Sequence, residues 1–410
     1  MVVEILDVQE RWKLDEERAP LHLIFIEEPE AHLHAQLQQV FIRNVLELLK
    51  IPGEEGSAFG SQVVITTHSP HILYERGFEP IRYFRRHVIA GEQTTKVLNL
   101  SRFQAGDAPK DRDFLQRYLK LTHCDLFFAD AAILVEGNVE RLLLPLMIEK
   151  EAKTLRSAAL SILEVCGAFG NRFSELIHFL GIITLVITDL DSVAVVAPPA
   201  DEGDEEEKEF EVPAEEDGEP PAKRYGKTCE VGEPDAVTAN QTLIQWLPKK
   251  LSITELLAAS PDDKIEAIPD TEHAKVRVAY QIPTNVTWAE SQALLCGRTL
   301  EVSFGLENAA WCQDAECKSL GLKLRGQIPT AAALATGLHK RVAGNYFDKT
   351  KFALEVLARK QEEWAVPRYI AEGLKWLETV VNLETAQEIQ ATAAAVAAEA
   401  VADPGSVGAV

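Results

Sequence analysis

The sequence has no long hydrophobic run, few cysteines and no basic leader. No uninterrupted apolar stretch in its 410 residues approaches the roughly 20 residues that a membrane-spanning helix needs. The first residues, Met-Val-Val-Glu-Ile-Leu-Asp, lack the basic segment and apolar core of a secretory signal. Six cysteines scattered over a chain of this length do not make a disulfide framework. These absences predict a protein of the reducing cytoplasm with no membrane partner.

A phosphate-binding loop is also missing. Loops of sequence Gly-x-x-x-x-Gly-Lys-[Ser/Thr] hold nucleotide phosphates with backbone N–H groups and a lysine. No such string occurs here, and the nearest glycine cluster, at 167–170, contains no lysine. We therefore expect no ATP hydrolysis from this chain alone.

Negative charge is concentrated in one segment. The formal net charge is -23, and residues 201–219 hold twelve acidic residues against Lys208 alone. With its prolines, this segment is typical of disordered chain, so residues 196–240 are predicted to be an acidic disordered linker. Because the acidic run supplies close to half of the negative charge, the net charge neither supports nor excludes DNA as a partner.

Two short apolar runs end in acidic residues. Ala-Ile-Leu-Val-Glu-Gly at 132–137 and Leu-Val-Ile-Thr-Asp-Leu-Asp at 185–191 have the pattern of buried parallel strands. Ligands of open α/β sheets bind at the carboxyl ends of the strands, so Glu136, Asp189 and Asp191 should converge on one crevice. Carboxylates at close range need a cation between them, and hard oxygen donors favour Mg²⁺ or Mn²⁺.

This pattern resembles the Toprim fold of topoisomerases, bacterial primases and a set of nucleases. Its mark is a glutamate after the first strand and an Asp-x-Asp after a later one, here Glu136 and 189–191. The spacing leaves room for a helix, a strand at 160–165 and a second helix at roughly 171–180. Glu140 would lie one helical turn after Glu136, and a solvated helix face is the alternative reading of this residue.

The first part of the chain resembles a portion of an ABC-type ATPase. Residues 23–34 are similar to a Walker B strand and its following loop. The resemblance implies that Glu27 binds magnesium, that Glu28 polarises the attacking water and that His68, in Ile-Thr-Thr-His-Ser-Pro, senses the γ-phosphate. Because the phosphate loop is missing, we expect the chain to be the C-terminal part of a longer protein, with ATP a cofactor of the full-length protein only. A degenerate, non-binding remnant is the alternative.

An ABC-type ATPase followed by Toprim is the arrangement of the OLD (overcoming lysogenisation defect) family of bacterial and phage-related nucleases. Four further segments resemble the family, and its class 2 in particular: 238–248, 297–301, 349–353 and 367–377. The resemblance implies that Glu301 is a further acid of the metal site, although an acid favoured at a helix N-terminus is the alternative. It also implies that Lys349 faces the substrate phosphate, with Lys351 as the rival candidate.

By this resemblance the protein is a metal-dependent DNA endonuclease, in which Lys349 acts with Glu136 and Asp189 as the catalytic residues. Two ions, Mg²⁺ or Mn²⁺, would be held by five acids: Glu136, Glu140, Asp189, Asp191 and Glu301. The implied partners are DNA, a second copy of the full-length protein joined through its ATPase domain, and a helicase encoded nearby, and the implied role is phage defence. The alternative is a non-catalytic recombination mediator or DNA-loading protein.

The predicted fold is α/β, a partial ABC-type ATPase lobe followed by a Toprim domain with a helical insertion and C-terminal helices. Its predicted segments are the ATPase part (1–110), the first half of the Toprim core (124–195), the acidic linker (196–240), the helical insertion (241–275), the rest of Toprim with the C-terminal helices (276–385) and a disordered tail (386–410).

Overall fold

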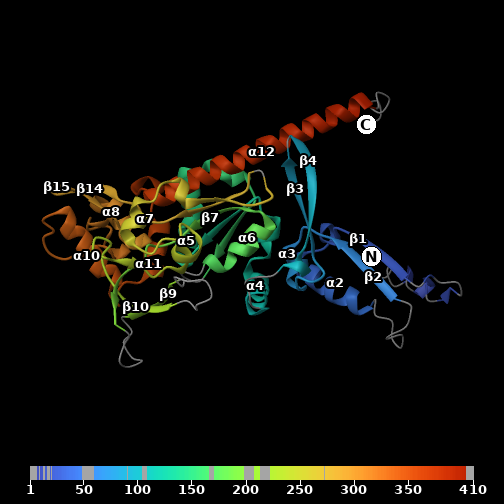
Figure 1. Ribbon diagram of the computed structural model, residues 1–410, viewed down its shortest axis with the longest axis horizontal. Coiled ribbons are helices and arrows are strands. Elements are labelled where there is room, and N and C mark those ends of the chain that lie inside the picture. Colours follow the sequence, from blue (N-terminus) through green and yellow to red (C-terminus); the bar gives the residue numbers. More distant parts are fainter. Residues whose placement is uncertain are drawn as a thin grey trace. The chain divides into compact units, whose positions relative to one another are not determined.

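The computed structural model describes two compact units. The described residues are 7–8, 10–12, 14–15, 19, 21–48, 60–89, 91–103, 109–165, 170–197, 207–212, 222–271 and 273–402. One unit comprises Met1–Phe84 and Val97–Phe128, and the other comprises Arg85–Lys96 and Ala129–Val410. Within the described part of the chain, no helix is both long and apolar enough to cross a membrane. Each unit is considered by itself below (Figure 1).

The first unit is built on two parallel strands, as its apolar runs predict. β1 (Leu21–Glu27) pairs with β2 (Gly60–Thr66), and α2 (Ala35–Leu48) lies between them in the chain (Figure 1). Ile26, Phe41, Ile42, Val45 and Ile72 form the core of this unit. Its other elements are η1 (Pro29–His32), α3 (Pro70–Tyr74), η2 (Leu100–Arg102), α4 (Pro109–Thr122) and η3 (Cys124–Phe128). A two-stranded sheet of β3 (Arg82–Ile89) and β4 (Glu92–Asn99) has its residues 85–96 in the second unit.

A five-stranded sheet forms the centre of the second unit (Figure 1). Its order is β12 (Ile265–Ala267), β13 (Lys275–Ala279), β7 (Ile183–Ile187), β5 (Ala131–Val135) and β6 (Leu160–Glu164). All neighbouring pairs are parallel except β12 with β13. Every residue of β5 and β7 is buried, as expected for strands that are covered on both faces.

The strand order of this sheet reverses between β5 and β7. From β5 the chain passes through α5 (Asn138–Glu151) to β6 on one side, and then through α6 (Ser174–Leu180) back to β7 on the other. Right-handed crossovers in opposite directions put the two helices on opposite faces. The carboxyl ends of β5 and β7 therefore lie at a topological switch point, the place where open α/β sheets bind their ligands. The predicted βαβαβ run is confirmed.

The remaining elements of the second unit surround this sheet. α12 (Arg368–Ala402) packs on β7 and β13 and contacts α5. The other helices are η4 (Lys153–Ser157), η5 (Gly170–Phe173), η6 (Thr242–Trp246), α7 (Ile253–Ala258), η7 (Asp262–Lys264), α8 (Leu300–Glu307), α9 (Ala309–Cys312), η8 (Lys318–Leu320), α10 (Ala331–Ala343), α11 (Lys349–Leu357) and η9 (Gln361–Glu363). β14 (Thr284–Trp288) and β15 (Ser291–Leu295) form an antiparallel pair.

A four-stranded antiparallel sheet occupies much of the segment predicted to be a disordered linker. Its order is β11 (Val237–Thr238), β8 (Ser192–Val196), β10 (Ala222–Thr228) and β9 (Glu207–Val212). The prediction of a linker over 196–240 is therefore wrong for these strands. Residues 198–206 and 213–221 of that segment lie outside the described residues.

Charge complementarity explains why so acidic a segment contains a strand. On β10, Lys223 places its Nζ 2.6 Å from Oε1 of Glu209 on β9, and the Tyr225 hydroxyl donates to the same carboxylate at 3.2 Å. Phe210 of β9 is buried and shares an apolar cluster with Val193 of β8. Opposite charges on facing strands attract each other, so a count of acids within one segment alone does not predict this pairing.

Two further predicted boundaries are corrected by the structure. The predicted disordered tail, 386–410, is helical as far as Ala402, because alanine, which dominates 391–402, is the best helix former. Residues 403–410 lie outside the described part. The predicted helical insertion, 241–275, contains η6 and α7 but also the edge strand β12, so it contributes to the central sheet.

The close approach of β10 and β8 can be tested at Gly226. A Cβ on this glycine would lie 2.5 Å from Cγ2 and 2.7 Å from Cβ of Val193. We expect Gly226→Ala to lower the free energy of unfolding by about 1–3 kcal/mol in urea denaturation, because the strands must separate to admit the methyl group. Gly232→Ala is the control, since a Cβ there meets nothing within 4 Å. Equal stabilities of the two variants would contradict the pairing of β10 with β8.

Candidate active site

The strand reversal brings two of the predicted acids side by side. β5 and β7 pair from Ala131 opposite Ile183 to Val135 opposite Ile187, so Glu136 and Thr188 follow at adjacent strand ends. The backbone N–H of Asp189 donates to Oε1 of Glu136 at 3.0 Å. The structure thus brings Glu136 and Asp189 into contact, as the sequence predicts.

Three donors converge on one oxygen of Glu136. Its Oε1 accepts hydrogen bonds from the Thr188 hydroxyl, from the Asp189 N–H and, at 2.7 Å, from Nδ2 of Asn240. Burial raises the pKa of Glu136 and the charge of Asp191 raises it further, whereas the three hydrogen bonds act in the opposite direction. The net shift of the Glu136 pKa is upward.

Hydrogen bonds also converge on one oxygen of Asp189. It is buried, and its Oδ1 accepts hydrogen bonds from Nε2 of Gln281 at 2.5 Å and from the Leu300 N–H at 3.0 Å. Burial raises the pKa of Asp189 well above its usual range, and the charges of Glu136 and Glu140 add to the rise. The acids of the crevice therefore repel one another.

Glu140 lies in the first turn of α5 and is buried, which rules out the alternative of a solvated helix face. Burial raises the pKa of Glu140 to about 8. The charges of Glu136 and Glu301 contribute to this rise, and the positive charge of Lys349 opposes it. Glu140 thus belongs to the same electrostatic cluster as Glu136.

Glu301 and Lys349 form an ion pair within this cluster. Glu301 stands in the first turn of α8 and is only 1% exposed, and its Oε1 lies 3.1 Å from Nζ of Lys349. Burial lowers the pKa of Lys349, but the charges of Glu301 and Asp189 outweigh that effect, so its pKa is raised. By contrast, the contact of Lys351 is a backbone one, in which its N–H donates to Oδ1 of Asp348 at 2.8 Å. The structure therefore places Lys349, and not Lys351, against the acids.

Asp191 has a cationic partner of its own. Its backbone is in the left-handed region, with φ of 46°, and its Oδ1 lies 2.5 Å from Nη2 of Arg298. Nε of Arg298 also donates to the Ser192 carbonyl at 3.0 Å. The sequence did not single out Arg298. Asp191 reaches the cluster through its electrostatic effect on Glu136.

The donor chemistry of these acids fits a hard divalent cation, although their placement is not a finished ligand cage. All five predicted ligands offer carboxylate oxygens. Burial, and after it the repulsion between the acids, raises the pKa values of Glu136, Glu140 and Asp189, and a bound cation would offset both effects. In the described residues, no three His, Cys, Asp or Glu side chains are placed so that they could hold a metal ion. Lys349 and Arg298 here neutralise part of the charge that a metal ion would balance.

In the first unit, the structure brings together two of the three residues predicted to bind nucleotide. Nε2 of His68 lies 3.3 Å from Oε1 of Glu28, whose backbone has φ of 38° and whose N–H donates to the Thr66 carbonyl at 3.0 Å. Glu27 is the last residue of β1 and directly precedes Glu28. No role is predicted for Glu30, yet its Oε1 accepts hydrogen bonds from the Thr67 hydroxyl at 2.9 Å and from the His68 N–H at 2.5 Å.

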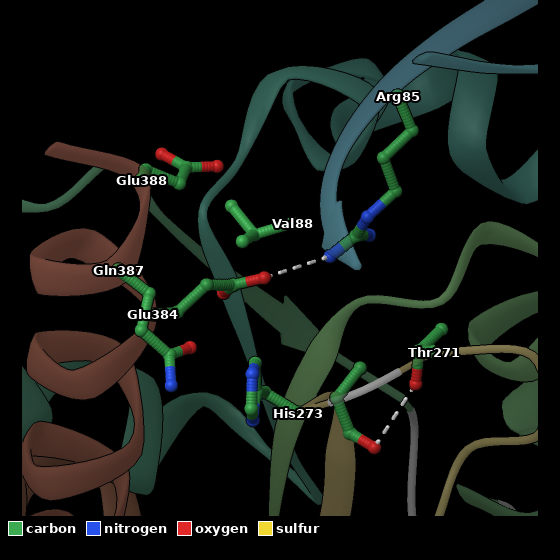
Figure 2. A pocket seen from close by; sticks show the side chains of 8 residues that line it. Arg85, Val88, Thr271, His273, Glu384, Gln387 and Glu388 are labelled. Carbon is green, nitrogen blue, oxygen red and sulfur yellow. Dashed lines mark hydrogen bonds and ion pairs between the residues drawn. The ribbon is translucent and has the colours of Figure 1, made fainter. Parts of the chain in front are cut away.

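A pocket of the second unit lies outside the predicted site (Figure 2). It is lined by Arg85, Val88, Thr271, His273, Ala274, Glu384, Gln387 and Glu388. Figure 2 shows Arg85 reaching toward Glu384, with Nη2 3.7 Å from Oε1. No predicted site residue lines this pocket.

Sequence comparisons agree with the two units. The sequence profile of the AAA ATPase domain matches residues 1–73, and that of the overcoming lysogenization defect protein-like TOPRIM domain matches residues 127–191. Endonuclease GajA of Bacillus cereus (strain HuB5-5) is 33% identical over 205 residues, which are 47% of this chain and 29% of that protein. Endonuclease GajA of Bacillus cereus (strain VD045) is 25% identical over 169 residues, 41% of this chain and 26% of that protein. The chain thus matches less than a third of the length of either relative.

The fold and these matches define a protein with an ATPase-like unit followed by a Toprim domain. These matches support the OLD family, which the motifs of the sequence predict.

The pair between Glu301 and Lys349 yields a prediction about stability. Lys349→Met leaves the buried Glu301 carboxylate without its cation, so we expect the free energy of unfolding near neutral pH to fall by about 1–3 kcal/mol. The loss stays below that of a fully buried pair because the Lys349 side chain is 53% exposed. Lys351→Met serves as the matched control in the same denaturation experiment. If both variants unfold at the same denaturant concentration, the ion pair does not stabilise the fold.

Proposed function

We propose that this chain carries the nuclease centre of a metal-dependent DNA endonuclease. The observation that supports the proposal most is the cluster of Glu136, Glu140, Asp189 and Glu301 at the carboxyl ends of adjacent parallel strands, with Lys349 against it. The Toprim match and the name endonuclease carried by both relatives point in the same direction. A cluster of this chemistry is suited to the cleavage of a phosphodiester bond.

Mg²⁺ or Mn²⁺ would be held by the five acids of the crevice: Glu136, Glu140, Asp189, Asp191 and Glu301. When bound, two such ions can activate a water molecule and stabilise the leaving 3′-oxygen of a phosphodiester. The residues of the chain have separate tasks. Lys349, whose raised pKa keeps it protonated, would balance negative charge on the non-bridging phosphate oxygens. Glu136 and Asp189, whose carboxylates are fixed by hydrogen bonds, would keep the water molecule and the phosphodiester in the orientation that the reaction needs.

The ATPase-like unit would regulate this centre in a longer protein. Glu28 and His68 lie in contact at the ends of adjacent strands, where a nucleotide phosphate would be sensed, and Glu27 precedes them. We propose that ATP acts only when a phosphate loop is present, that the full-length protein forms a dimer through this domain, and that it acts with a helicase encoded nearby in defence against phage.

Cleavage of plasmid DNA tests the proposed activity. We expect the chain to nick or linearise supercoiled plasmid with Mn²⁺ or Mg²⁺, and EDTA to stop the reaction. Asp189→Asn should lower the cleavage rate by about 100-fold or more, because it removes a charged ligand from the site. Asp263→Asn changes an acid whose partners are Ser260 and Lys250, outside the crevice, and should cleave at the parent rate. Plasmid that stays intact with both metals would favour a non-catalytic DNA-loading role.

Nucleotide turnover provides a separate test of the first unit. We expect no release of phosphate from ATP above background with Mg²⁺, because the 410 residues contain no phosphate-binding loop. Glu28→Gln should then leave the background unchanged. Phosphate release by the parent chain that Glu28→Gln abolishes would show that the unit hydrolyses ATP without such a loop.

A further inference from the structure

Two fully buried amide side chains contact the acids of the crevice. Asn240 follows β11, and Gln281 follows β13, so they approach from different parts of the second unit. Both have an exposed fraction of 0%. A buried amide without hydrogen bonds costs free energy, so the hydrogen-bond partners of these two side chains indicate what the side chains do.

The orientation of the Asn240 amide is fixed by the backbone. Its Oδ1 accepts a hydrogen bond from the Thr242 N–H at 3.0 Å, which only an oxygen can do. Nδ2 must therefore face the other way, toward three acceptors. These are Oε1 of Glu136 at 2.7 Å, Oγ1 of Thr188 at 2.6 Å and the Asp189 carbonyl at 2.8 Å. Asn240 thus ties the end of β5 to the end of β7.

A backbone N–H group also orients the Gln281 amide. Its Oε1 accepts from the Leu190 N–H at 2.7 Å, so Nε2 must be the group that donates to Oδ1 of Asp189 at 2.5 Å. The Leu300 N–H donates to that same Oδ1 at 3.0 Å. One amide is therefore directed at each of the two carboxylates, and each amide is anchored by a backbone N–H.

Among the residues that the structure describes, the hydrogen bonds occupy only one oxygen of each carboxylate. Every donor to Glu136 reaches Oε1, and every donor to Asp189 reaches Oδ1. Within the described residues, Oε2 of Glu136 and Oδ2 of Asp189 accept no hydrogen bond. When one oxygen is held by hydrogen bonds, the carboxylate group can no longer rotate. The second oxygen of each group therefore points in a fixed direction and can contact a further partner.

We propose that Asn240 and Gln281 are positioning residues, which hold Glu136 and Asp189 with one oxygen bound and the other presented to a divalent cation. This inference rests on the proposed function and adds to it two residues that do not bind the ion. Hydrogen-bonded partners of this kind orient metal ligands, and their removal typically weakens metal binding by about 10–100-fold.

Binding of Mn²⁺ alone, measured by titration calorimetry on the whole chain, tests this proposal without any need for catalysis. Asn240→Ala and Gln281→Leu should each raise the dissociation constant for Mn²⁺ by about 10–100-fold. The matched controls are Asn308→Ala and Gln313→Leu. Within the described part of the chain, the Asn308 amide bonds only to backbone groups of Phe304 and Ala365, and the Gln313 amide only to those of Leu322 and Leu324. The controls should lose comparable thermal stability and bind Mn²⁺ as the parent does.

The outcomes separate the proposal from the proposed function. If Asp189→Asn abolishes Mn²⁺ binding while Asn240→Ala and Gln281→Leu bind as the parent does, the amides are purely structural and the inference is overturned, but the metal site stands. If the parent chain binds no Mn²⁺, the metal site and the inference fall together. An equal loss of affinity in the control variants would also overturn the inference, because it would trace the effect to lost stability.

Nuclear magnetic resonance of the ¹⁵N-labelled parent chain keeps the test independent of variants that fail to fold. The side-chain NH₂ groups of Asn240 and Gln281 should exchange slowly with solvent and should change chemical shift when Mg²⁺ is added. The NH₂ group of Asn308 should not shift. Unchanged signals from Asn240 and Gln281 in saturating Mg²⁺ would overturn the proposal.

Discussion

Mutual repulsion among buried carboxylates governs the centre of the second unit. The reversal of strand order between β5 and β7 brings Glu136 and Asp189 together, and the pKa values of both acids rise as a result of burial and of nearby negative charge. The surrounding elements supply hydrogen-bond donors and a positively charged side chain, which offset this repulsion. β13 leads to Gln281, α8 begins at the N–H of Leu300, and α11 begins at Lys349. β13, α8 and α11 therefore place polar and charged groups beside the acids, in addition to their apolar packing.

Local sequence patterns predict the parts of the fold whose causes are local. The apolar runs that precede Glu136 and Asp189 are long enough for one buried strand each and are followed at once by acids, so both the strands and the acids could be inferred. Glu140 could also be inferred, because a helix that begins directly after this strand end keeps its first turn close to Glu136. The contact between Glu28 and His68 likewise follows from two strand ends that lie next to each other.

Features whose causes are distant in the sequence could not be predicted in this way. β9 is acidic and looks disordered until its partner β10 supplies Lys223 and an apolar environment for Phe210. Asn240 and Gln281 are ordinary polar residues in the sequence, and only the tertiary fold shows that each contacts a carboxylate more than ninety residues away. The predicted disordered tail is wrong as far as Ala402 for another reason, because its high alanine content favours a helix.

The wide spacing of the groups that hold the two acids bears on biosynthesis. Glu136 is translated first among the residues of the cluster, and Asn240, Gln281, Leu300 and Lys349 follow it, in that order. A nascent chain that has exposed only β5, β6 and β7 has the acids without the groups that orient and neutralise them. The cluster therefore cannot be complete before Lys349 has been translated, and a translation product that stops before Asn240 lacks the groups that organise it.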